Sequence, residues 1–379
     1  MELSIHPVEN KVDLKAFVEF PWQIYKNDPF WVSPQLDDRY SNLDVARNPY
    51  WQDSERVLWL ARLGSKPVGT IASIVDYRRN KHTGNPVGVF GFFECINDEN
   101  IARGLLKCAG DWLRQHGFSR MIGPYNPSES DENGILIEGF NTRPAIMEAH
   151  TPYYYPTIFD GAGCAKYNDL VARLAVIPPE CKNLDQIFPE KLRRIAEQVS
   201  RRPDIHIRKV KMQEWQAEIK MACNLYNQAL SPVPDIVPIS EDEFLVFANS
   251  FKAILSPDMV LIAEVGSRPV GSAIALPDVN EALQHLDGKL GPIGLAKFWW
   301  FSRKIKRVSF KILIMVPEFQ GRGIEALLTY RMAQAIWNHG YKEIDMSLTG
   351  EENLKSSLFQ ERIGFKVYRR YRIYQKDLA

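Results

Sequence analysis

The chain has 379 residues, of which 45% are hydrophobic and 25% charged, and its formal net charge is +1. This length is enough for two hydrophobic cores, and the near-zero charge argues against nucleic acid as the main partner of the whole chain. We find neither an apolar leader nor a run of about 18 apolar residues, so we expect a soluble, cytoplasmic protein without a transmembrane segment. The five cysteines are scattered and odd in number, which predicts neither a disulfide framework nor a metal site.

The first half of the chain shows strand and helix patterns in alternation. Apolar residues flanking the turn at Gly64 predict a hairpin, and apolar residues at helical spacing after Asn97 predict a long helix. The predicted elements are a strand at 2–8, a helix at 12–26, a hairpin at 56–63 and 67–76, a strand at 87–95, a helix at about 98–116, a strand at 119–123 and a closing strand at 171–176.

The second half begins after the Pro178-Pro179 pair, which interrupts regular structure. A helical connector at about 183–202 leads into a second set of elements. They are a strand at 204–210, helices at 212–229 and 240–253, a hairpin at 258–277, an insertion to about 305, a strand at 306–316, a helix at 322–339, a strand at 343–348, a helix at 352–362 and a strand at 365–375.

The two halves of the sequence repeat each other. Residues 60–69, LARLGSKPVG, reappear 202 residues later as residues 262–271, IAEVGSRPVG. Further on, residues 115–118, QHGF, match residues 338–341, NHGY, at an offset of 223, so the second copy has gained 21 residues. A period this long indicates duplicated domains, since solenoid repeats span only about 20–50 residues. The expected domains are residues 1–177 and 178–379.

The second copy contains a strand, a glycine turn and a helix start in succession. The apolar residues 312–315 lead through Pro317 to Gly321 and Gly323, and a helical pattern follows from Ile324. Glycines leave the backbone N–H groups of such a turn open to an anion, and the helix dipole adds about half a positive charge there. This pattern predicts a cradle for a pyrophosphate group.

The glycine turn resembles the Gln/Arg-x-x-Gly-x-Gly/Ala loop of the GNAT superfamily of N-acyltransferases. Gln320, Gly321, Arg322, Gly323 and Ile324 match it. The final Gly or Ala of the loop is Glu325 here, and its carboxylate either repels a pyrophosphate or points away from it. The resemblance implies an α/β (α+β) fold of two tandem GNAT-like domains, each a mixed, mostly antiparallel twisted sheet flanked by helices.

A second GNAT signature follows the first. Asn353 and Gly364-Phe365 have its spacing, but Gln360 stands where many relatives have a Tyr that protonates the leaving thiolate. The resemblance implies acyl-CoA as a co-substrate, with acetyl-CoA expected, and no metal.

The first copy differs at the position of the glycine turn. It has residues 97–101, Asn-Asp-Glu-Asn-Ile, where the second copy has residues 319–323. Asn and Asp side chains satisfy the free N–H groups at a helix start, and two carboxylates would repel a phosphate. We therefore expect a degenerate first domain without a phosphate loop, and one acyl-CoA site in the second.

The expected catalytic groups follow from the needs of acyl transfer. The resemblance implies that a strand N–H of Met315 or Val316 polarises the thioester carbonyl. Glu318 is a candidate catalytic base, although a glutamate beside a helix start is more often a partner of the helix dipole. Arg322 is either a phosphate ligand or solvated, and Asn353 either binds the cofactor or caps the next helix. The candidate cofactor-binding residues are Met315, Val316, Gln320, Gly321, Arg322, Gly323, Ile324 and Asn353.

Two aromatic segments have open roles. The first is the aromatic cluster within residues 150–155, which either lines the acceptor pocket or, as we favour, packs a domain interface. The second is the basic aromatic segment 297–311. It either docks on a membrane, stacks on nucleotides or holds an acyl chain, or it forms a helix buried against the other copy, which we favour. The candidate acceptor-binding residues are His150, Tyr153, Tyr154 and Tyr155.

We therefore predict an N-acyltransferase that transfers an acyl group, with acetyl expected, from acyl-CoA to an amine of a small molecule or peptide. Three alternatives remain open. The first is an aminoacyl-tRNA-dependent peptidyl transferase of the peptidoglycan-bridge type. The second is a long-chain N-acyltransferase that resembles N-myristoyltransferase, and the third is a non-catalytic acyl-CoA-binding protein.

Overall fold

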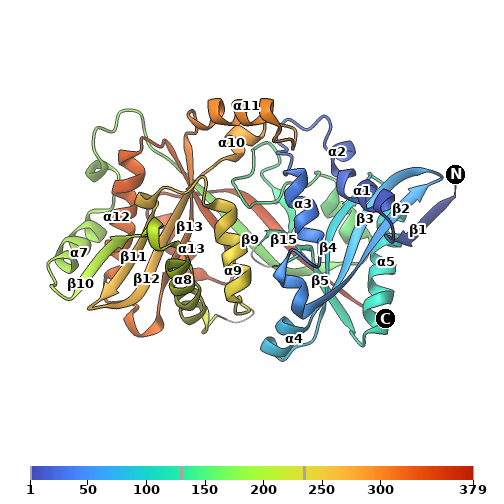
Figure 1. The fold of residues 1–379 in the computed structure, drawn as a ribbon, viewed down its shortest axis with the longest axis horizontal. Coiled ribbons are helices and arrows are strands. Elements are labelled where there is room, and N and C mark those ends of the chain that lie inside the picture. Colours follow the sequence, from blue (N-terminus) through green and yellow to red (C-terminus); the bar gives the residue numbers. More distant parts are fainter. Residues whose placement is uncertain (1, 129–130, 234–235, 379) are drawn as a thin grey trace.

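The computed structural model describes residues 2–128, 131–233 and 236–378. The two halves of the chain lie side by side along the longest axis of the molecule, with helices packed against the strands of each half (Figure 1). One mixed sheet of 13 strands runs through the described part of both halves. This arrangement confirms the predicted α/β (α+β) fold class.

The first half contains the first nine strands and the first six helices of the described residues. Its strands are β1 (Leu3–Pro7), β2 (Ser54–Leu63), β3 (Lys66–Asp76), β4 (Gly88–Cys95), β5 (Arg120–Gly123), β6 (Tyr125–Asn126), β7 (Glu132–Asn133), β8 (Ile135–Glu138) and β9 (Ala165–Val176). Its helices are α1 (Lys11–Glu19), α2 (Pro21–Ile24), α3 (Leu36–Leu43), α4 (Tyr77–Thr83), α5 (Glu99–Gln115) and α6 (Tyr155–Gly161).

The second half repeats this order with longer helices near its start. Its strands are β10 (Ile205–Lys209), β11 (Val260–Val265), β12 (Arg268–Pro277), β13 (Arg307–Met315), β14 (Glu343–Gly350) and β15 (Lys366–Asp377). Its helices are α7 (Glu190–Ser200), α8 (Trp215–Leu230), α9 (Glu241–Phe251), α10 (Asn280–Leu283), α11 (Pro292–Ser302), α12 (Ile324–Asn338) and α13 (Leu354–Arg362).

The two halves complete each other's part of the sheet. The strand order is β1-β2-β3-β4-β5-β15-β9-β14-β13-β12-β11-β10, and β8 also pairs with β15. Thus β9, from the first half, pairs with β14 of the second, while β15, the last strand of the chain, pairs with β5 of the first. The predicted division after residue 177 remains a proposal about the sequence repeat, since the sheet continues across it.

The strands β13 and β14 separate at the centre of the second half. They pair in parallel only from Arg307 with Glu343 to Phe310 with Met346, although β13 continues to Met315. Beyond this point the two strands diverge, which leaves strand backbone unpaired on the side where they part. This splay and the glycine turn that follows β13 position the candidate site.

Alternating residues of β11 and β12 bury opposite faces of the second half. Leu261 and Ala273 pack into a core with α7 and α12, whereas Ile262 and Ile274 pack with α8 and α9. The period of two is that of strands buried on both faces. Helices α8 and α9 therefore lie on the face of the sheet opposite α12.

The first half has its own core, in which α5 covers β3 and β4. The helix begins at an Asp98 side chain that accepts hydrogen bonds from the backbone N–H groups of Asn100 and Ile101. A bound anion would need these same N–H groups. In the first copy they already donate to the cap residue Asp98, as expected.

Two sequence predictions of elements are wrong in detail. The single helix expected at 12–26 is divided into α1 and α2, because Pro21 has no N–H to continue the hydrogen bonds of α1. The closing strand expected at 171–176 begins earlier, at Ala165, and its added residues pair with the end of β15.

Candidate functional site

The glycine turn after β13 is open on one side and packed on the other. Gly321 and Gly323 have backbone φ angles of 72° and 83°, in the left-handed region that favours glycine. A Cβ on Gly321 would meet nothing within 4 Å, whereas a Cβ on Gly323 would lie 2.9 Å from Ile195 and 3.0 Å from Val199 of α7. Gly321 therefore faces open space, and Gly323 allows α7 to pack against the turn.

The carboxylate of Glu325 already occupies part of the predicted cradle. It accepts a hydrogen bond of 3.0 Å from the backbone N–H of Gly321. An acidic side chain in the first turn of a helix is stabilised by the helix dipole, as a bound phosphate would be. The cradle thus has the geometry to hold an anion, and a pyrophosphate would have to displace Glu325 from it.

The neighbouring motif residues are held by local contacts. Gln320 donates from its side-chain amide to the carbonyl of Met315 over 3.1 Å, which fixes the turn to the end of β13. The Arg322 guanidinium lies 4.9 Å from the centre of the Phe319 ring, on the exposed side of the turn. Ile324 is buried in the core under α12. Only Arg322 of these three has a side chain free to reach a phosphate.

The backbone N–H of Met315 or Val316 was expected to bind the thioester carbonyl. For Val316 this prediction is wrong, and for Met315 it remains a prediction. The Val316 N–H donates to the carbonyl of Val270 in β12 over 2.9 Å and is therefore engaged. Successive N–H groups of a strand point to opposite sides, so the Met315 N–H points toward β14. Since β14 pairs with β13 only as far as Phe310, this side of Met315 faces the splay.

Glu318 is a poor candidate for the catalytic base. Its side chain is 64% exposed and forms an ion pair of 2.9 Å with Arg268. It lies in a short 3-10 turn, Pro317–Phe319, and lines neither the large apolar cavity nor the smaller pocket described below. A carboxylate in this position is solvated, and its ion-pair partner Arg268 is itself half exposed.

Asn353 and Gln360 both have structural partners. The Asn353 side chain accepts from the Ser356 N–H over 3.1 Å and caps α13, which is the simpler of its two predicted roles. Gln360 is buried and donates to the hydroxyls of Thr349 and Ser356. Its amide therefore belongs to the packing of α13 on β14.

Two members of the predicted acceptor cluster, Tyr154 and Tyr155, pack in the core of the first half. The Tyr155 hydroxyl donates to Glu94 over 2.7 Å, and the Tyr154 hydroxyl donates to the Cys95 carbonyl over 2.8 Å. His150 is buried between Asp28 and the guanidinium of Arg369, whereas Tyr153 is exposed. None of the four predicted acceptor-binding residues lines the large cavity described below. These residues are His150, Tyr153, Tyr154 and Tyr155.

The large cavity lies between the sheet and the helices α8 and α9. It has a volume of about 530 Å³, and its walls come from β11–β14, α8, α9 and a few residues of the first half. Most of the lining side chains are aliphatic or aromatic, such as Ile219, Phe244, Ile262 and Leu313. Residues 311–314 bring the cavity to the point where β13 leaves β14. An apolar chain lodged here would end beside the splay.

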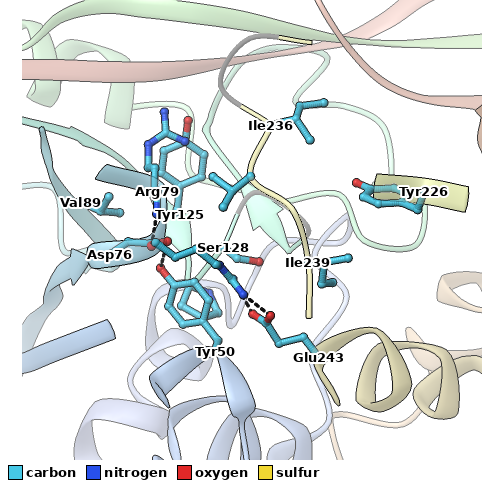
Figure 2. A pocket seen from close by; sticks show the side chains of 13 residues that line it. Tyr50, Asp76, Arg79, Val89, Tyr125, Ser128, Tyr226, Ile236, Ile239 and Glu243 are labelled. Atoms are coloured by element: carbon cyan, nitrogen blue, oxygen red, sulfur yellow. Dashed lines mark hydrogen bonds and ion pairs between the residues drawn. The ribbon is translucent and has the colours of Figure 1, made fainter. Parts of the chain in front are cut away.

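A smaller polar pocket of about 160 Å³ lies between the two halves and shares part of its wall with the large cavity. Figure 2 shows Tyr50 donating to Asp76, over 3.0 Å, on one side of this pocket. Close to this pair, Arg78 of the first half forms a two-point ion pair with Glu243 of α9. This pair ties α9, one wall of the apolar cavity, to the first half.

A buried group of polar side chains lies next to the splay, where β13 and β14 are still paired, and on the same face as the cavity. Ser309 of β13 donates to Asp345 of β14, and Tyr368 bridges Asp345 and Glu148, with distances of 2.9 and 3.1 Å. Glu148 comes from the first half, and one of its carboxylate oxygens has no hydrogen-bond partner among the described residues. The next residue before it, Met147, lines the cavity, as does Lys311.

The environment of Glu148 favours its protonated form. The carboxyl is buried, with 3% of its surface exposed, and lies near the carboxylate of Asp345. Burial first, and then the Asp345 charge, raise the pKa of Glu148, while Lys311 and Arg369 oppose this shift. The group can therefore exchange a proton near neutral pH.

Glu148, Lys311 and Asp345 were not predicted as site residues. Two of them interrupt apolar strand patterns, since Lys311 precedes Ile312-Leu313 and Asp345 lies between Ile344 and Met346. A charged residue inside a predicted buried strand is the signal that would have drawn attention to them. Glu148 has no such signal, because it lies in an irregular segment.

Comparison with solved structures shows the class of fold. The tandem GNAT protein from the clavulanic acid biosynthesis pathway has a TM-score of 0.59 and 11% identity, over 100% of this chain and 99% of that chain. A GCN5-related N-acetyltransferase from Sphaerobacter thermophilus has a TM-score of 0.52 and 12% identity, over 100% and 96%. The protein therefore has the tandem GNAT fold of N-acyltransferases. No protein-family model matches the chain.

Two curated proteins are similar over nearly their full length. Protein YghO of Escherichia coli (strain K12) is 30% identical over 375 residues, which are 97% of this chain and 94% of YghO. The bacterial ceramide synthase of Caulobacter vibrioides (strain NA1000 / CB15N) is 29% identical over 384 residues, with 100% and 98% covered. The chain belongs to the family of Protein YghO. Its fold and these relatives support acyl transfer as its class of reaction.

Proposed function

We propose that this protein is an acyl-CoA-dependent N-acyltransferase whose amine acceptor carries a long hydrocarbon chain. The observation that carries the proposal is the apolar cavity that reaches the splay of β13 and β14. Its volume of about 530 Å³ is within the range of small-molecule sites, and its walls favour hydrocarbon over a polar peptide. A cytoplasmic location, predicted from the sequence, remains part of this proposal.

The relative named bacterial ceramide synthase supports the same substrate class. A ceramide is the amide of a long-chain amino alcohol with a fatty acid, so its formation joins an acyl group to an amine with a long chain. The fatty acyl half of a ceramide, and not the cavity that we assign to the acceptor, argues against the acetyl group expected from the sequence. We therefore favour the long-chain alternative over the acetyltransferase.

In the proposed site, the two substrates bind on opposite faces of the sheet. The cradle of Gly321 and Gly323 lies at the N-terminus of α12, whereas the cavity lies under α8 and α9 on the opposite face. We assign the CoA diphosphate to the cradle, with Arg322 beside it, and the acceptor chain to the cavity. The splay is where the two would meet.

The proposed reaction is a direct attack by the amine on the thioester. The amine nitrogen forms a bond to the thioester carbon, the carbon–sulfur bond breaks, and the sulfur leaves with the electron pair. A β13 N–H that faces the splay supports the carbonyl oxygen as it gains negative charge. Glu148 accepts the proton that the nitrogen must lose, and its unpartnered oxygen is the proposed acceptor atom.

Assays with substrates of graded chain length test the proposal. The purified protein is incubated with acetyl-CoA or a long-chain acyl-CoA and with either sphinganine or ethanolamine, and the amide is detected by mass spectrometry. We expect amide from sphinganine and at least tenfold less from ethanolamine. Equal turnover of both amines, or no amide from any pair, would overturn the proposal.

A substitution inside the cavity gives a matched control. Ala222 of α8 lines the cavity, whereas Ala217 of the same helix is exposed. Ala222→Trp fills the cavity and is expected to raise the KM for sphinganine at least tenfold, while Ala217→Trp leaves it unchanged. An unchanged KM in a folded Ala222→Trp variant would place the acceptor chain elsewhere.

A further inference from the structure

Helix α11 exposes large apolar side chains that a folded protein normally buries. Its exposed side chains include Ile293 at 76%, Leu295 at 55%, Trp299 at 56% and Trp300 at 55%, and none of the residues of α11 is buried. The burial of this segment against the other copy, which we favoured from the sequence, is therefore wrong. Figure 1 shows α11 at the periphery of the molecule, outside the sheet and its covering helices.

The segments that flank α11 are anchored at both ends. Before the helix, Asp287 accepts a hydrogen bond of 3.1 Å from the Trp22 indole of the first half. After the helix, Glu281 accepts from the backbone N–H groups of Lys306 and Arg307. The ring of Phe301 stacks on His285 at a centroid distance of 3.8 Å. The apolar side chains are thus presented by a supported helix.

The same segment is strongly basic. No acidic residue occurs between Asp287 and Glu318 in the sequence. The Arg303 guanidinium lies 3.4 Å from the centre of the Trp299 ring, and the Lys304 ammonium lies 4.9 Å from that of Trp300. Together with Lys297, these exposed cations have no ion pair to a carboxylate within the described residues. The exposed apolar side chains and the cations therefore lie together on α11 and the turn that follows it.

We propose that α11 docks the protein on the surface of an anionic lipid bilayer. Tryptophan rings beside arginine and lysine are suited to the headgroup region, where the rings enter the acyl boundary and the cations meet lipid phosphates. The helix has 11 residues and a length of about 16 Å, about half of a hydrocarbon core, so it lies on the bilayer rather than across it. No helix among the described residues is both long and apolar enough to cross a membrane.

Two other occupants of this surface fit less well. In a symmetric dimer the same patch would face itself, and its cations would meet cations. Nucleic acid would use the charges but leave Ile293 and Leu295 in water, and the whole chain has a net charge of only +1. An anionic bilayer satisfies both the apolar and the charged side chains. This inference does not depend on the proposed reaction.

Sedimentation with vesicles tests the proposal without any assay of activity. The full-length protein is mixed with vesicles of phosphatidylcholine alone or with phosphatidylglycerol added. We expect binding to the anionic vesicles, weaker binding at high salt, and at least tenfold weaker binding to phosphatidylcholine. Equal binding to both vesicles, or to neither, would overturn the proposal.

Paired variants separate the patch from the rest of the surface. Trp299→Ser with Trp300→Ser, and separately Arg303→Glu with Lys304→Glu, are each expected to weaken binding at least tenfold. The controls are Val12→Ser and Lys107→Glu, since both side chains are largely exposed far from α11 in the sequence. Unchanged binding by both patch variants, or an equal loss in the controls, would contradict docking through α11. A loss in the patch variants alone supports it.

Discussion

At the scale of single residues, two glutamates near the splay have opposite environments. Glu318 is exposed and paired with Arg268, so its carboxylate faces solvent. Glu148 is buried beside Asp345, and one of its oxygens lacks a hydrogen-bond partner among the described residues. A base for an ammonium group needs a pKa near the working pH, and burial gives Glu148 such a pKa. This contrast favours Glu148 over the glutamate that the sequence suggested.

Matched amide substitutions distinguish the two glutamates. Glu148→Gln is expected to lower kcat by about 100-fold or more, since general base catalysis contributes roughly 100- to 10,000-fold. Glu318→Gln should change kcat by less than about twofold, because exposed ion pairs contribute little. Steady-state kinetics with the long-chain amine provides the measurement. A larger loss in Glu318→Gln than in Glu148→Gln would restore Glu318 as the base.

The same burial predicts how stability depends on pH. Burial raises the pKa of Glu148 from 4.5 to about 7, so the folded protein binds more protons than the unfolded chain between these pH values. The free energy of unfolding should therefore fall as the pH rises through this window. In Glu148→Gln this part of the fall should be absent. Urea unfolding at several pH values from 4.5 to 8 measures it, and identical pH profiles for both proteins would contradict the assignment.

Glu325 is expected to act as a competitor of the CoA diphosphate. Its carboxylate accepts from the Gly321 N–H, so cofactor binding must first break this contact. Glu325→Ala should strengthen CoA binding by about 1 kcal/mol, roughly fivefold, since charges at a helix start are worth about that much. Calorimetric titration with CoA provides the measurement, and Glu318→Ala is the control that removes equal charge from the same turn. Weaker binding by Glu325→Ala would show that the carboxylate supports the cradle.

At the scale of elements, the two glycines of the turn between β13 and α12 have different surroundings. Gly321 borders open space, whereas Gly323 lies against α7. Helix α7 therefore holds one side of the turn fixed and leaves the other available to a ligand. A loop that is supported on one side in this way can present its N–H groups without collapsing onto them.

Alanine substitutions of the two glycines should separate binding from folding. Gly321→Ala is expected to cost about 1–2 kcal/mol of stability, from the left-handed backbone alone. Gly323→Ala should cost more, because its Cβ also presses against Ile195 and Val199. CoA affinity should fall in Gly321→Ala even at temperatures where the variant is fully folded. Thermal unfolding and CoA titration measure the two effects, and equal stability losses would contradict the role of α7.

The sequence predicted the elements better than it predicted the site. The glycine motif and the repeated segments are short sequence patterns, so the tandem fold, the glycine turn and the Asp98 cap could be predicted from the sequence. The engaged amide of Val316 was not, because its partner Val270 lies on another strand. Glu148 reaches the splay from the other half of the chain, and only the exchange of β9 and β15 explains how it arrives there. Contacts between distant segments carry no signature in a single sequence.

At the scale of the whole molecule, the exchange of strands makes the two halves interdependent. The central strands β15 and β9 pair with each other, and each also pairs with a strand of the opposite half. Separating the halves would leave unpaired strand edges at the centre of the sheet, where N–H and C=O groups are costly to expose. The proposed acceptor site also needs both halves, since Glu148 belongs to one and Lys311 to the other.

We therefore expect the protein to unfold in one transition. Ile373 of β15 is 1% exposed and packs in the core of the first half, although it belongs to the last strand of the chain. Ile373→Ala should lower the free energy of unfolding by about 2–5 kcal/mol, as for other large apolar side chains truncated in a core. Hydrogen exchange should report this loss equally for the amides of β3 and β12, because opening either half requires β15 to leave the sheet. If only β3 lost protection, or if urea produced two separate transitions, the halves would be independent units joined by a dispensable strand pair.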